Sequence, residues 1–352
     1  MRGCVMGRQV PILKDVAQRA GVAVQTVSSI LHDRPGYTPE TRARVLAAIE
    51  ELGYRPFSVA QSLRTRQTHT IALIISDIAN PSFATMASAA EDYAYQFGYS
   101  LVVYNTHDDI EREIGYIRTI AQRWIDGALF VSTEDRATSL DAFLAAGIPV
   151  VAIDRIPEGY GGPSVTLDNV KAGCIAAEHL LALGHTNLAH ISGPMRLQLA
   201  RERHAGFAHA VEARGIQLSY CVGGDGNWGC EYGYRAMMNL LGCVPRPTGV
   251  FAANDRMAIG AMRAIYEAGL RVPDDISVVG LDDIEVAAYQ SPPLTTVRQS
   301  FTELATRALQ LLLEILDDKE PDQPHVVLEP TLIVRQTSAP PRAFSQGVAE
   351  GR

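Results

Sequence analysis

The sequence predicts two parts of different fold class: an N-terminal all-α head of three short helices, and a larger α/β body of two lobes, each with a doubly wound parallel sheet. In the head, apolar side chains recur at helical spacing. In the body, which starts near Thr70, short apolar runs alternate with amphipathic stretches, and the alternation begins again after about Leu167. With 352 residues, of which 47% are hydrophobic, the chain can hold two or three domains with sizeable cores.

The head is expected to contain two helices joined by a tight turn, followed by a third helix. Apolar residues recur at helical spacing over residues 16 to 20 and again over residues 22 to 31. Between them, Gly21 can adopt the positive φ that a tight turn requires. The third helix is predicted from Pro39 to Leu52, with Thr38 as its N-cap. In such a unit the second helix is short and faces solvent on one side, which suits it to the major groove of DNA.

Charge separates this interpretation from an ordinary protein-packing domain, which the helix pattern alone fits equally well. Residues 1 to 68 hold ten Lys or Arg and five Asp or Glu, a net charge of +5, whereas the remainder holds 21 and 34, a net charge of −13. A basic end on an acidic protein is typical of a module that binds phosphates, and the acidic remainder disfavours nonspecific binding to nucleic acid.

The head resembles the N-terminus of the lactose-repressor/galactose-repressor (LacI/GalR) family of transcription factors. The residues that carry the resemblance are Leu13-Lys14-Asp15-Val16-Ala17, Ala20-Gly21-Val22, Thr26-Val27-Ser28, Thr41-Arg42, Val45 and Leu52-Gly53-Tyr54-Arg55-Pro56. The resemblance continues along the chain to about Arg335. It implies a sequence-specific DNA-binding regulator, and in particular a repressor whose partners are double-stranded operator DNA, a small sugar-type effector and a second copy of the chain.

The resemblance assigns DNA contacts to individual residues of the head. Base-edge contacts are expected from Val24, Gln25 and Ser29, and phosphate contacts from Thr26, Ser28, Arg42 and Arg55. The chemistry is suitable, because Gln pairs bidentately with adenine and Val touches a thymine methyl, whereas phosphate contacts position without specifying. Ala23 stands where the family usually has a Ser that caps the second helix, a loss of roughly 1 kcal/mol. Ser29 replaces a longer residue, so the operator half-site is expected to differ from the usual one.

A short stretch from residues 58 to 68 follows the head. It is too short to form a stable helix alone, since isolated helices under ~12 residues are marginal in water. The resemblance makes it the hinge helix, which pairs with its copy in the minor groove and contacts DNA through Ala60 and Leu63, with Leu63 inserted into a base step. The alternative is a plain linker with one apolar residue.

The body is predicted to alternate strands and helices. Strands are expected at residues 71–76, 101–104, 128–131, 150–153, 188–192, 249–252 and 277–280, and helices at 83–97, 111–124, 140–146, 170–183, 203–214, 233–241 and 257–268. The pattern resembles the type I periplasmic-binding-protein fold, in which the chain crosses between the lobes three times. We place the crossings near Thr166, Leu294 and Lys319.

These crossings give the predicted domain bounds. The helix-turn-helix head spans residues 10–57 and the hinge with its linker residues 58–68. The effector-binding body spans residues 69–338, with an N-lobe of 69–166 plus 295–319 and a C-lobe of 167–294 plus 320–338. The tail, 339–352, lacks a heptad pattern, so a dimer is expected and not a tetramer.

Polar residues follow the predicted strands at several points, and ligands of open parallel sheets sit beyond the carboxyl ends of strands. By resemblance, the residues expected to bind the effector are Phe83, Asp154, Arg155, Arg201, Arg203, Trp228, Asn254, Asp282 and Gln299. Carboxylates, amides and guanidinium groups bind hydroxyls bidentately, and aromatic rings cover a C–H face, so this set suits a sugar. Ser82 replaces the usual first Phe of a pair, which leaves the identity of the sugar open.

Each of these residues could instead have a purely structural role. Asp154 or Asp255, for example, could cap a helix that follows a strand. Two other motifs also have ordinary explanations. Residues 224 to 229 satisfy G-x-G-x-x-G, but residues 241 to 254 contain no acidic residue to hold a ribose, so no nucleotide cofactor is expected. The acidic run from His107 to Glu113 is expected to be a solvated helix start and not a metal site.

Composition excludes several other classes. No run approaches ~18 apolar residues and the first ten residues lack an apolar signal region, so a cytoplasmic protein without a membrane partner is expected. The five cysteines share no ligand-like spacing, which disfavours disulfides and a metal site. No nucleophile motif is present, so an enzyme is not expected. The remaining alternatives are a transport-type sugar-binding protein and a regulator whose effector promotes DNA binding.

Overall fold

The structure is a computed structural model that describes residues 11–31, 34–54, 67–122, 125–135, 140–224 and 226–342. The chain divides into two compact units, Met1–Thr68 and His69–Arg352. Among the described residues, no helix has both the length and the apolar character needed to cross a bilayer.

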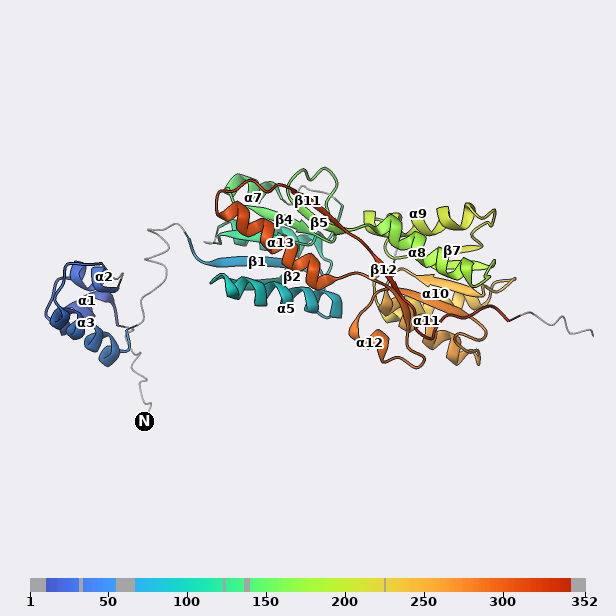
Figure 1. Cartoon of the computed structure of the whole chain (residues 1–352), viewed down its shortest axis with the longest axis horizontal. Helices are drawn as coiled ribbons and strands as arrows, with labels where there is room; N and C mark the ends of the chain where they lie inside the picture. The colour runs from blue at the N-terminus through green and yellow to red at the C-terminus, as the bar shows by residue number, and fades with distance from the viewer. Residues whose placement is uncertain are drawn as a thin grey trace, which may run out of the picture. The chain divides into compact units, whose positions relative to one another are not determined.

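The first unit contains the three predicted helices, α1 (Leu13–Ala20), α2 (Val24–Leu31) and α3 (Pro39–Leu52) (Figure 1). Gly21 ends α1 in the left-handed region at φ 66°, as the turn requires. Thr38 caps α3, because its hydroxyl accepts the backbone N–H of Thr41. One fully buried valine from each helix, Val16, Val27 and Val45, forms the centre of the small core.

The N-lobe of the second unit is built on a six-stranded sheet with strand order β11-β5-β4-β3-β1-β2. All its neighbouring strands are parallel, and Ile71 pairs with Leu101 on one side and Gly127 on the other. The strands are β1 (Thr70–Ile75), β2 (Ser100–Asn105), β3 (Gly127–Phe130), β4 (Val150–Ile153), β5 (Ser164–Leu167) and β11 (His325–Leu328).

The side chains of the central strand β1 alternate between the two faces of this sheet. Ile71, Leu73 and Ile75 pack into the core on one face, and Ala72 and Ile74 pack into the core on the other. All five side chains are fully buried. This continuous apolar run is typical of a parallel strand that is covered by helices on both faces.

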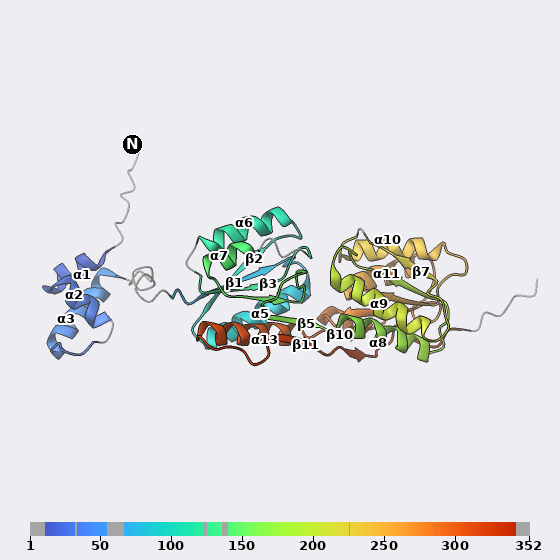
Figure 2. The same cartoon turned by 90° about the horizontal axis from the view of Figure 1, so that it is seen from above.

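Two helices cover each face of this sheet (Figure 2). The helices α5 (Pro81–Gln96) and α13 (Phe301–Leu316) pack on one face, and α6 (Ile110–Ala121) and α7 (Asp141–Ala146) pack on the other. The helix α13 comes from late in the chain and was not among the predicted elements. It lies so close to β3 that a Cβ on Gly127 would be 2.8 Å from the Leu312 side chain.

The C-lobe has a second six-stranded sheet with strand order β12-β10-β9-β8-β6-β7. Its strands are β6 (Leu188–Ile191), β7 (Tyr220–Val222), β8 (Gly249–Ala252), β9 (Ser277–Asp282), β10 (Thr295–Arg298) and β12 (Thr331–Ile333). The edge strand β12 runs antiparallel to β10, whereas the other pairs are parallel. The helices α8 (Asn169–Ala182) and α9 (Gln198–Glu212) cover one face, α10 (Cys230–Leu241) and α11 (Asp255–Glu267) cover the other, and the short α12 (Glu285–Ala288) precedes β10.

The strand order corrects two of the predicted lobe bounds. Residues 295–298, predicted for the N-lobe, form β10 of the C-lobe sheet, so the second crossing follows Arg298 and not Leu294. Residues 325–328, predicted for the C-lobe, form β11 of the N-lobe sheet, so the third crossing follows Leu328 and not Lys319. Neither segment was among the predicted strands, and a local apolar pattern does not give the sheet that a strand joins, because that choice depends on a partner strand far away in the sequence.

Glycines let the paired helices of the C-lobe approach closely. A Cβ on Gly206 of α9 would lie 1.9 Å from the carbonyl oxygen of Val170 in α8, and a Cβ on Gly173 of α8 would lie 2.1 Å from that of Arg203 in α9. Such distances are far below van der Waals contact, so any side chain there forces the helices apart. The position of α9 therefore depends on Gly206.

We expect Gly206→Ala to decrease the free energy of unfolding by ~1–3 kcal/mol, because the added methyl group overpacks the helix crossing. Chemical denaturation of the purified variant measures this change. Gly115→Ala is the matched control, because Gly115 lies in α6 with no atom within 4 Å of an added Cβ. The control should be neutral or more stable by ~0.5–1 kcal/mol. Equal stability of the two variants would contradict the close-packing argument.

Candidate functional site

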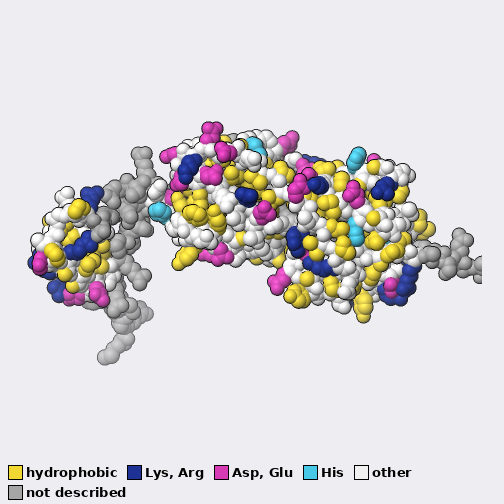
Figure 3. Space-filling model, in the orientation of Figure 1, with side chains coloured by type: hydrophobic (Ala, Val, Ile, Leu, Met, Phe, Trp, Pro, Cys, Tyr) yellow, Lys and Arg dark blue, Asp and Glu magenta, His cyan; other side chains and the backbone are white. Residues whose placement is uncertain are grey.

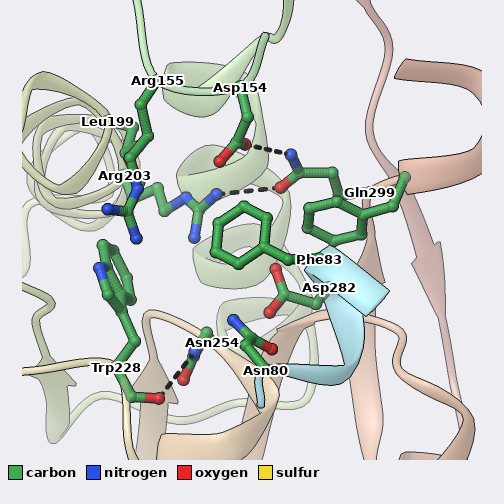
Figure 4. Close-up of a pocket in the computed structure, with 11 residues that line it drawn as sticks. Asn80, Phe83, Asp154, Arg155, Leu199, Arg203, Trp228, Asn254, Asp282 and Gln299 are labelled. Carbon is green, nitrogen blue, oxygen red and sulfur yellow. Dashed lines mark hydrogen bonds between the residues drawn. The ribbon is translucent and has the colours of Figure 1, made fainter. Parts of the chain in front are cut away.

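A small cavity lies between the two lobes, beyond the carboxyl ends of strands from both sheets (Figure 4). The N-lobe contributes Asn80, Phe83, Asp154, Arg155 and Phe301, and the C-lobe contributes Leu199, Arg203, Trp228, Asn254 and Asp282. Gln299 lies on the crossing segment between β10 and α13. The walls therefore combine two carboxyl groups, two guanidinium groups, three amides and three aromatic rings.

A chain of hydrogen bonds connects the lobes across this cavity. Arg203 Nη2 donates to Gln299 Oε1 over 3.0 Å, and Gln299 Nε2 donates to Asp154 Oδ1 over 2.5 Å. Arg203 belongs to the C-lobe and Asp154 to the N-lobe, so the amide of Gln299 joins one lobe to the other. All three side chains are buried. In such surroundings hydrogen bonds to charged groups are stronger than in water, and an unpaired partner is costly.

The guanidinium of Arg203 is oriented by two further acceptors. Nε donates to Asn169 Oδ1 and Nη1 donates to the carbonyl oxygen of Ala253, both over 2.8 Å. Its planar fork is therefore bound in three directions, which an ammonium group could not reproduce. These contacts fix the direction in which the charge faces the cavity.

Neither Asp154 nor Asp255 caps a helix, which was the structural alternative for each. Asn254, and not Asp255, caps α11, because its Oδ1 accepts the backbone N–H of Met257, while its Nδ2 donates to the carbonyl oxygen of Trp228. Asp255 is fully buried and accepts from the Thr296 hydroxyl and the Ile284 backbone N–H. No helix directly follows Asp154.

Two residues of the cavity have unusual backbone conformations. Asp154 has φ 62° and Asp282 has φ 126°, values that favour glycine. Such conformations typically cost about 1–3 kcal/mol each and are found mostly where the surrounding structure holds a functional side chain in place.

Aromatic rings lie beside the guanidinium groups. The guanidinium carbon of Arg155 is 5.5 Å from the centre of the Phe83 ring and 5.8 Å from that of Trp228, and the corresponding carbon of Arg203 is 5.6 Å from Trp228. These are cation–π distances. The indole N–H of Trp228 is buried and has no hydrogen-bond partner among the described residues.

Burial raises the pKa of Asp282 to about 7, with Arg203 opposing the shift and Asp154 adding to it. Burial also raises the pKa of Asp255 well above its usual value, and the nearby Asp282 raises it further. Below about pH 7 the Asp282 carboxyl is protonated and can donate a hydrogen bond as well as accept one. In this state Asp282 adds a donor to those of the guanidinium and amide groups.

The structure brings together eight of the nine residues predicted for effector binding: Phe83, Asp154, Arg155, Arg203, Trp228, Asn254, Asp282 and Gln299. Arg201 is the exception. It does not line the cavity but forms an ion pair with Asp135 at 2.7 Å and donates to the carbonyl oxygens of Met195 and Arg196. Helix geometry explains the correction, since residues two apart on a helix point in nearly opposite directions and Arg203 faces the cavity.

Three cavity residues were not among those predicted to bind the effector. Leu199 lies four residues before Arg203 on α9, and that spacing places both on one helix face. The spacing alone could therefore have indicated that Leu199 faces the cavity. Asn80 caps α5 as well as lining the cavity. Phe301 lies edge-on to Phe83, with ring centres 6.2 Å apart, and supplies a second ring near the place where Ser82 removes one. The Ser82 hydroxyl instead donates to Asp282 Oδ2 over 3.4 Å.

The head presents the predicted DNA-contact residues on its surface. Val24 and Gln25 are exposed on α2, and Thr26, Ser28, Ser29 and Arg42 are partly exposed. Val27 and Ile30, on the opposite face of α2, are buried in the core of the head. Three further predicted residues, Arg55, Ala60 and Leu63, lie outside the described residues, as does most of the predicted hinge.

Comparisons with known proteins agree with this combination of head and body. Residues 12–56 match the family model described as bacterial regulatory proteins of the lacI family, and residues 177–338 match the periplasmic binding protein-like domain. The HTH-type transcriptional repressor PurR of Vibrio campbellii is 35% identical over 328 residues, which cover 92% of this chain and 98% of that protein.

Solved structures show the same similarity. A lac repressor dimer bound to operator and the anti-inducer ONPF has a TM-score of 0.84 at 32% identity and covers 94% of this chain and 100% of its own. A LacI family transcriptional regulator from Enterococcus faecium with bound ribose has a TM-score of 0.71 at 28% identity and covers 78% of this chain and 100% of its own.

A helix-turn-helix head attached to a two-lobed body with an interlobe cavity defines a ligand-controlled transcriptional regulator and not an enzyme. The chain belongs to the lacI family of bacterial regulatory proteins. The resemblance predicted from the sequence is thereby confirmed.

The raised pKa of Asp282 predicts a pH dependence of stability. In the folded protein Asp282 stays protonated up to about pH 7, whereas its ordinary pKa is 3.8. Between these values the folded state binds more protons, so this group makes the free energy of unfolding fall as the pH rises. Asp282→Asn does not titrate at this position, so its melting temperature should fall less than that of the wild type between about pH 5 and 7. Calorimetry at several pH values measures this, and parallel curves would contradict it.

Gln25→Ala should relax the base preference at one position of each half-site. Loss of a bidentate contact costs ~1–3 kcal/mol against the preferred base only. Selection from a randomised duplex library with both proteins measures the preference. The matched control is Gln18→Ala, an exposed glutamine on α1, which should leave the preference unchanged. An unaltered preference in Gln25→Ala would move base recognition to other residues.

Proposed function

We propose that this protein is a repressor that binds a pseudo-palindromic operator as a homodimer, with an affinity controlled by a small sugar-type effector in the interlobe cavity. The observation that carries the proposal is the hydrogen-bond chain from Asp154 through Gln299 to Arg203. Because this chain connects the lobes at the cavity wall, a ligand bound there contacts both lobes, and any difference in its affinity for two lobe arrangements shifts the balance between them. That is the property a regulatory ligand needs.

The chemistry of the cavity supports a polyhydroxylated effector. Carboxyl, amide and guanidinium groups pair with neighbouring hydroxyls, and the rings of Phe83 and Trp228 can cover the C–H face of a sugar. The bound ribose of the Enterococcus faecium relative supports the same class of ligand.

Exposed apolar residues support the dimer. On the N-lobe, Tyr95 and Phe97 are 76% and 54% exposed, and on the C-lobe, Tyr266 and Tyr289 are 74% and 80% exposed. Figure 3 shows hydrophobic side chains gathered over parts of both lobes. Large apolar side chains in contact with water favour association. Two-fold pairing of the chain also matches a pseudo-palindromic operator, in which each head reads one half-site.

The effector's influence on DNA binding follows from coupling between two sites. A coupling free energy of ~1–3 kcal/mol changes operator affinity about 5–150-fold. We propose that the sugar relieves repression, which requires that it bind better to the lobe arrangement that disfavours pairing of the hinges. A regulator of this kind acts in the cytoplasm, where bacterial DNA lies.

The test combines DNA and carbohydrate binding. A labelled duplex selected from a randomised library is titrated with the protein, alone and with D-ribose, D-galactose or cellobiose, and fluorescence anisotropy measures the Kd. We expect one carbohydrate to raise the Kd about 5–150-fold. Asp282→Ala should lose this response with its DNA affinity kept, and Asp275→Ala, which removes a C-lobe carboxylate outside the cavity, should retain it.

The other outcomes are informative as well. A carbohydrate that lowers the Kd would reverse the sign and make the effector a co-repressor. No preference for any double-stranded site over random duplex, with or without carbohydrate, would refute the proposal. Carbohydrate binding without any effect on DNA would favour a sugar-binding protein of the transport type.

A further inference from the structure

A second contact between the lobes lies outside the cavity. Arg201 Nη2, near the start of α9 in the C-lobe, donates to Asp135 Oδ2 of the N-lobe over 2.7 Å. The other carboxylate oxygen of Asp135 accepts the backbone N–H of Gln198, the first residue of α9, over 2.9 Å. A single N-lobe carboxylate therefore makes two hydrogen bonds to one C-lobe helix.

The helix α9 lacks a cap from its own sequence. Its N-cap residue is Leu197, whose side chain makes no capping hydrogen bond, whereas α8 and α11 are capped by Asp168 and Asn254. The first N–H groups of a helix have no partner within the helix, and the helix dipole favours a negative charge beside them. Asp135 supplies from the opposite lobe the cap that Leu197 cannot provide.

Each partner is also held within its own lobe. The backbone N–H of Glu158 donates to the carbonyl oxygen of Asp135. Arg201 Nη1 donates to the carbonyl oxygens of Met195, over 3.0 Å, and Arg196, over 2.8 Å. Because the guanidinium of Arg201 and the backbone at Asp135 are each held within their own lobe, less conformational entropy is lost when the lobes meet.

A second ion pair joins the lobes but lacks these features. Arg256 of α11 contacts Asp77 of the N-lobe over 3.2 Å. The other oxygen of Asp77 accepts the backbone N–H of Ala79 in its own lobe, and not that of a C-lobe helix. The contact through Asp135 is therefore the stronger candidate for holding the lobes together.

We infer that Asp135 is a positioning residue for the interlobe cavity: it caps α9 from the opposite lobe and thereby keeps Arg203 against Gln299 and Asp154. Arg203 lies two residues beyond Arg201 on the same helix, so movement of the start of α9 away from the N-lobe would also separate Arg203 from Gln299. The regulatory meaning of this contact rests on the proposed function, but the contact itself does not.

The test uses the full chain and needs neither effector nor DNA. Asp135→Asn removes the charge and weakens both bonds, which should shift the lobes about tenfold toward separation, since hydrogen bonds to charged groups contribute more than neutral ones. Hydrogen exchange in peptides covering residues 195–201 should become about tenfold faster. The chain has two tryptophans, so Trp124→Phe makes the fluorescence report on Trp228 alone. In this background, acrylamide should also quench Trp228 more strongly, because Trp228 is buried at the cavity wall.

Asp275→Asn is the matched control. Asp275 accepts both the backbone N–H of Arg271, over 2.9 Å, and its guanidinium Nε, over 3.1 Å, but within the C-lobe. This variant should leave the exchange at residues 195–201 and the quenching of Trp228 unchanged. Arg201→Gln keeps the Gln198 bond to Asp135, so it should have a smaller effect than Asp135→Asn.

Two results would overturn the inference. Wild-type exchange and quenching in Asp135→Asn would show that the contact does not position the lobes. Faster exchange throughout the C-lobe would show a general loss of stability and not a positioning role. Failure of the carbohydrate and DNA titrations, with the Asp135→Asn effects present, would refute the proposed function alone.

Discussion

The amide of Gln299 connects the two lobes, because it accepts from Arg203 in one lobe and donates to Asp154 in the other. Such a bridge requires three buried polar side chains from distant parts of the chain to meet with correct geometry. If one of them moved away, the others would be left buried without a partner, which is costly in a nonpolar environment. The polar cavity and the relative position of the lobes are therefore parts of one interaction.

The packing of the C-lobe places one end of this bridge. Gly173 and Gly206 allow α8 and α9 to approach so closely that no side chain fits between them, and Arg203 lies one turn from Gly206. The strained backbones of Asp154 and Asp282 fix two more polar groups. The protein thus gives up some folding free energy to fix these side chains, as expected where a ligand must meet preorganised partners.

The charge distribution of the cavity follows from burial. Two neighbouring carboxyl groups, Asp255 and Asp282, lie in the C-lobe interior, and burial raises the pKa of both. Asp255 connects α11 to β10 through Thr296 and to the start of α12 through Ile284, whereas Asp282 faces the cavity. One carboxyl group is therefore structural and the other is placed to contact a ligand.

The sequence by itself determined the three-helix head and much of the alternation of strands and helices, because local apolar periodicity and capping residues such as Thr38 are encoded in short stretches. Most of the cavity residues followed from polar residues at strand ends together with the family resemblance. The tertiary structure decided what depends on distant partners: the sheets that β10 and β11 join, the contribution of Phe301 from α13, and the outward direction of Arg201. The start of α9 shows the reason most clearly. No residue near Leu197 caps this helix, and the carboxylate that does so, Asp135, lies in the other lobe, where only folding brings it into contact.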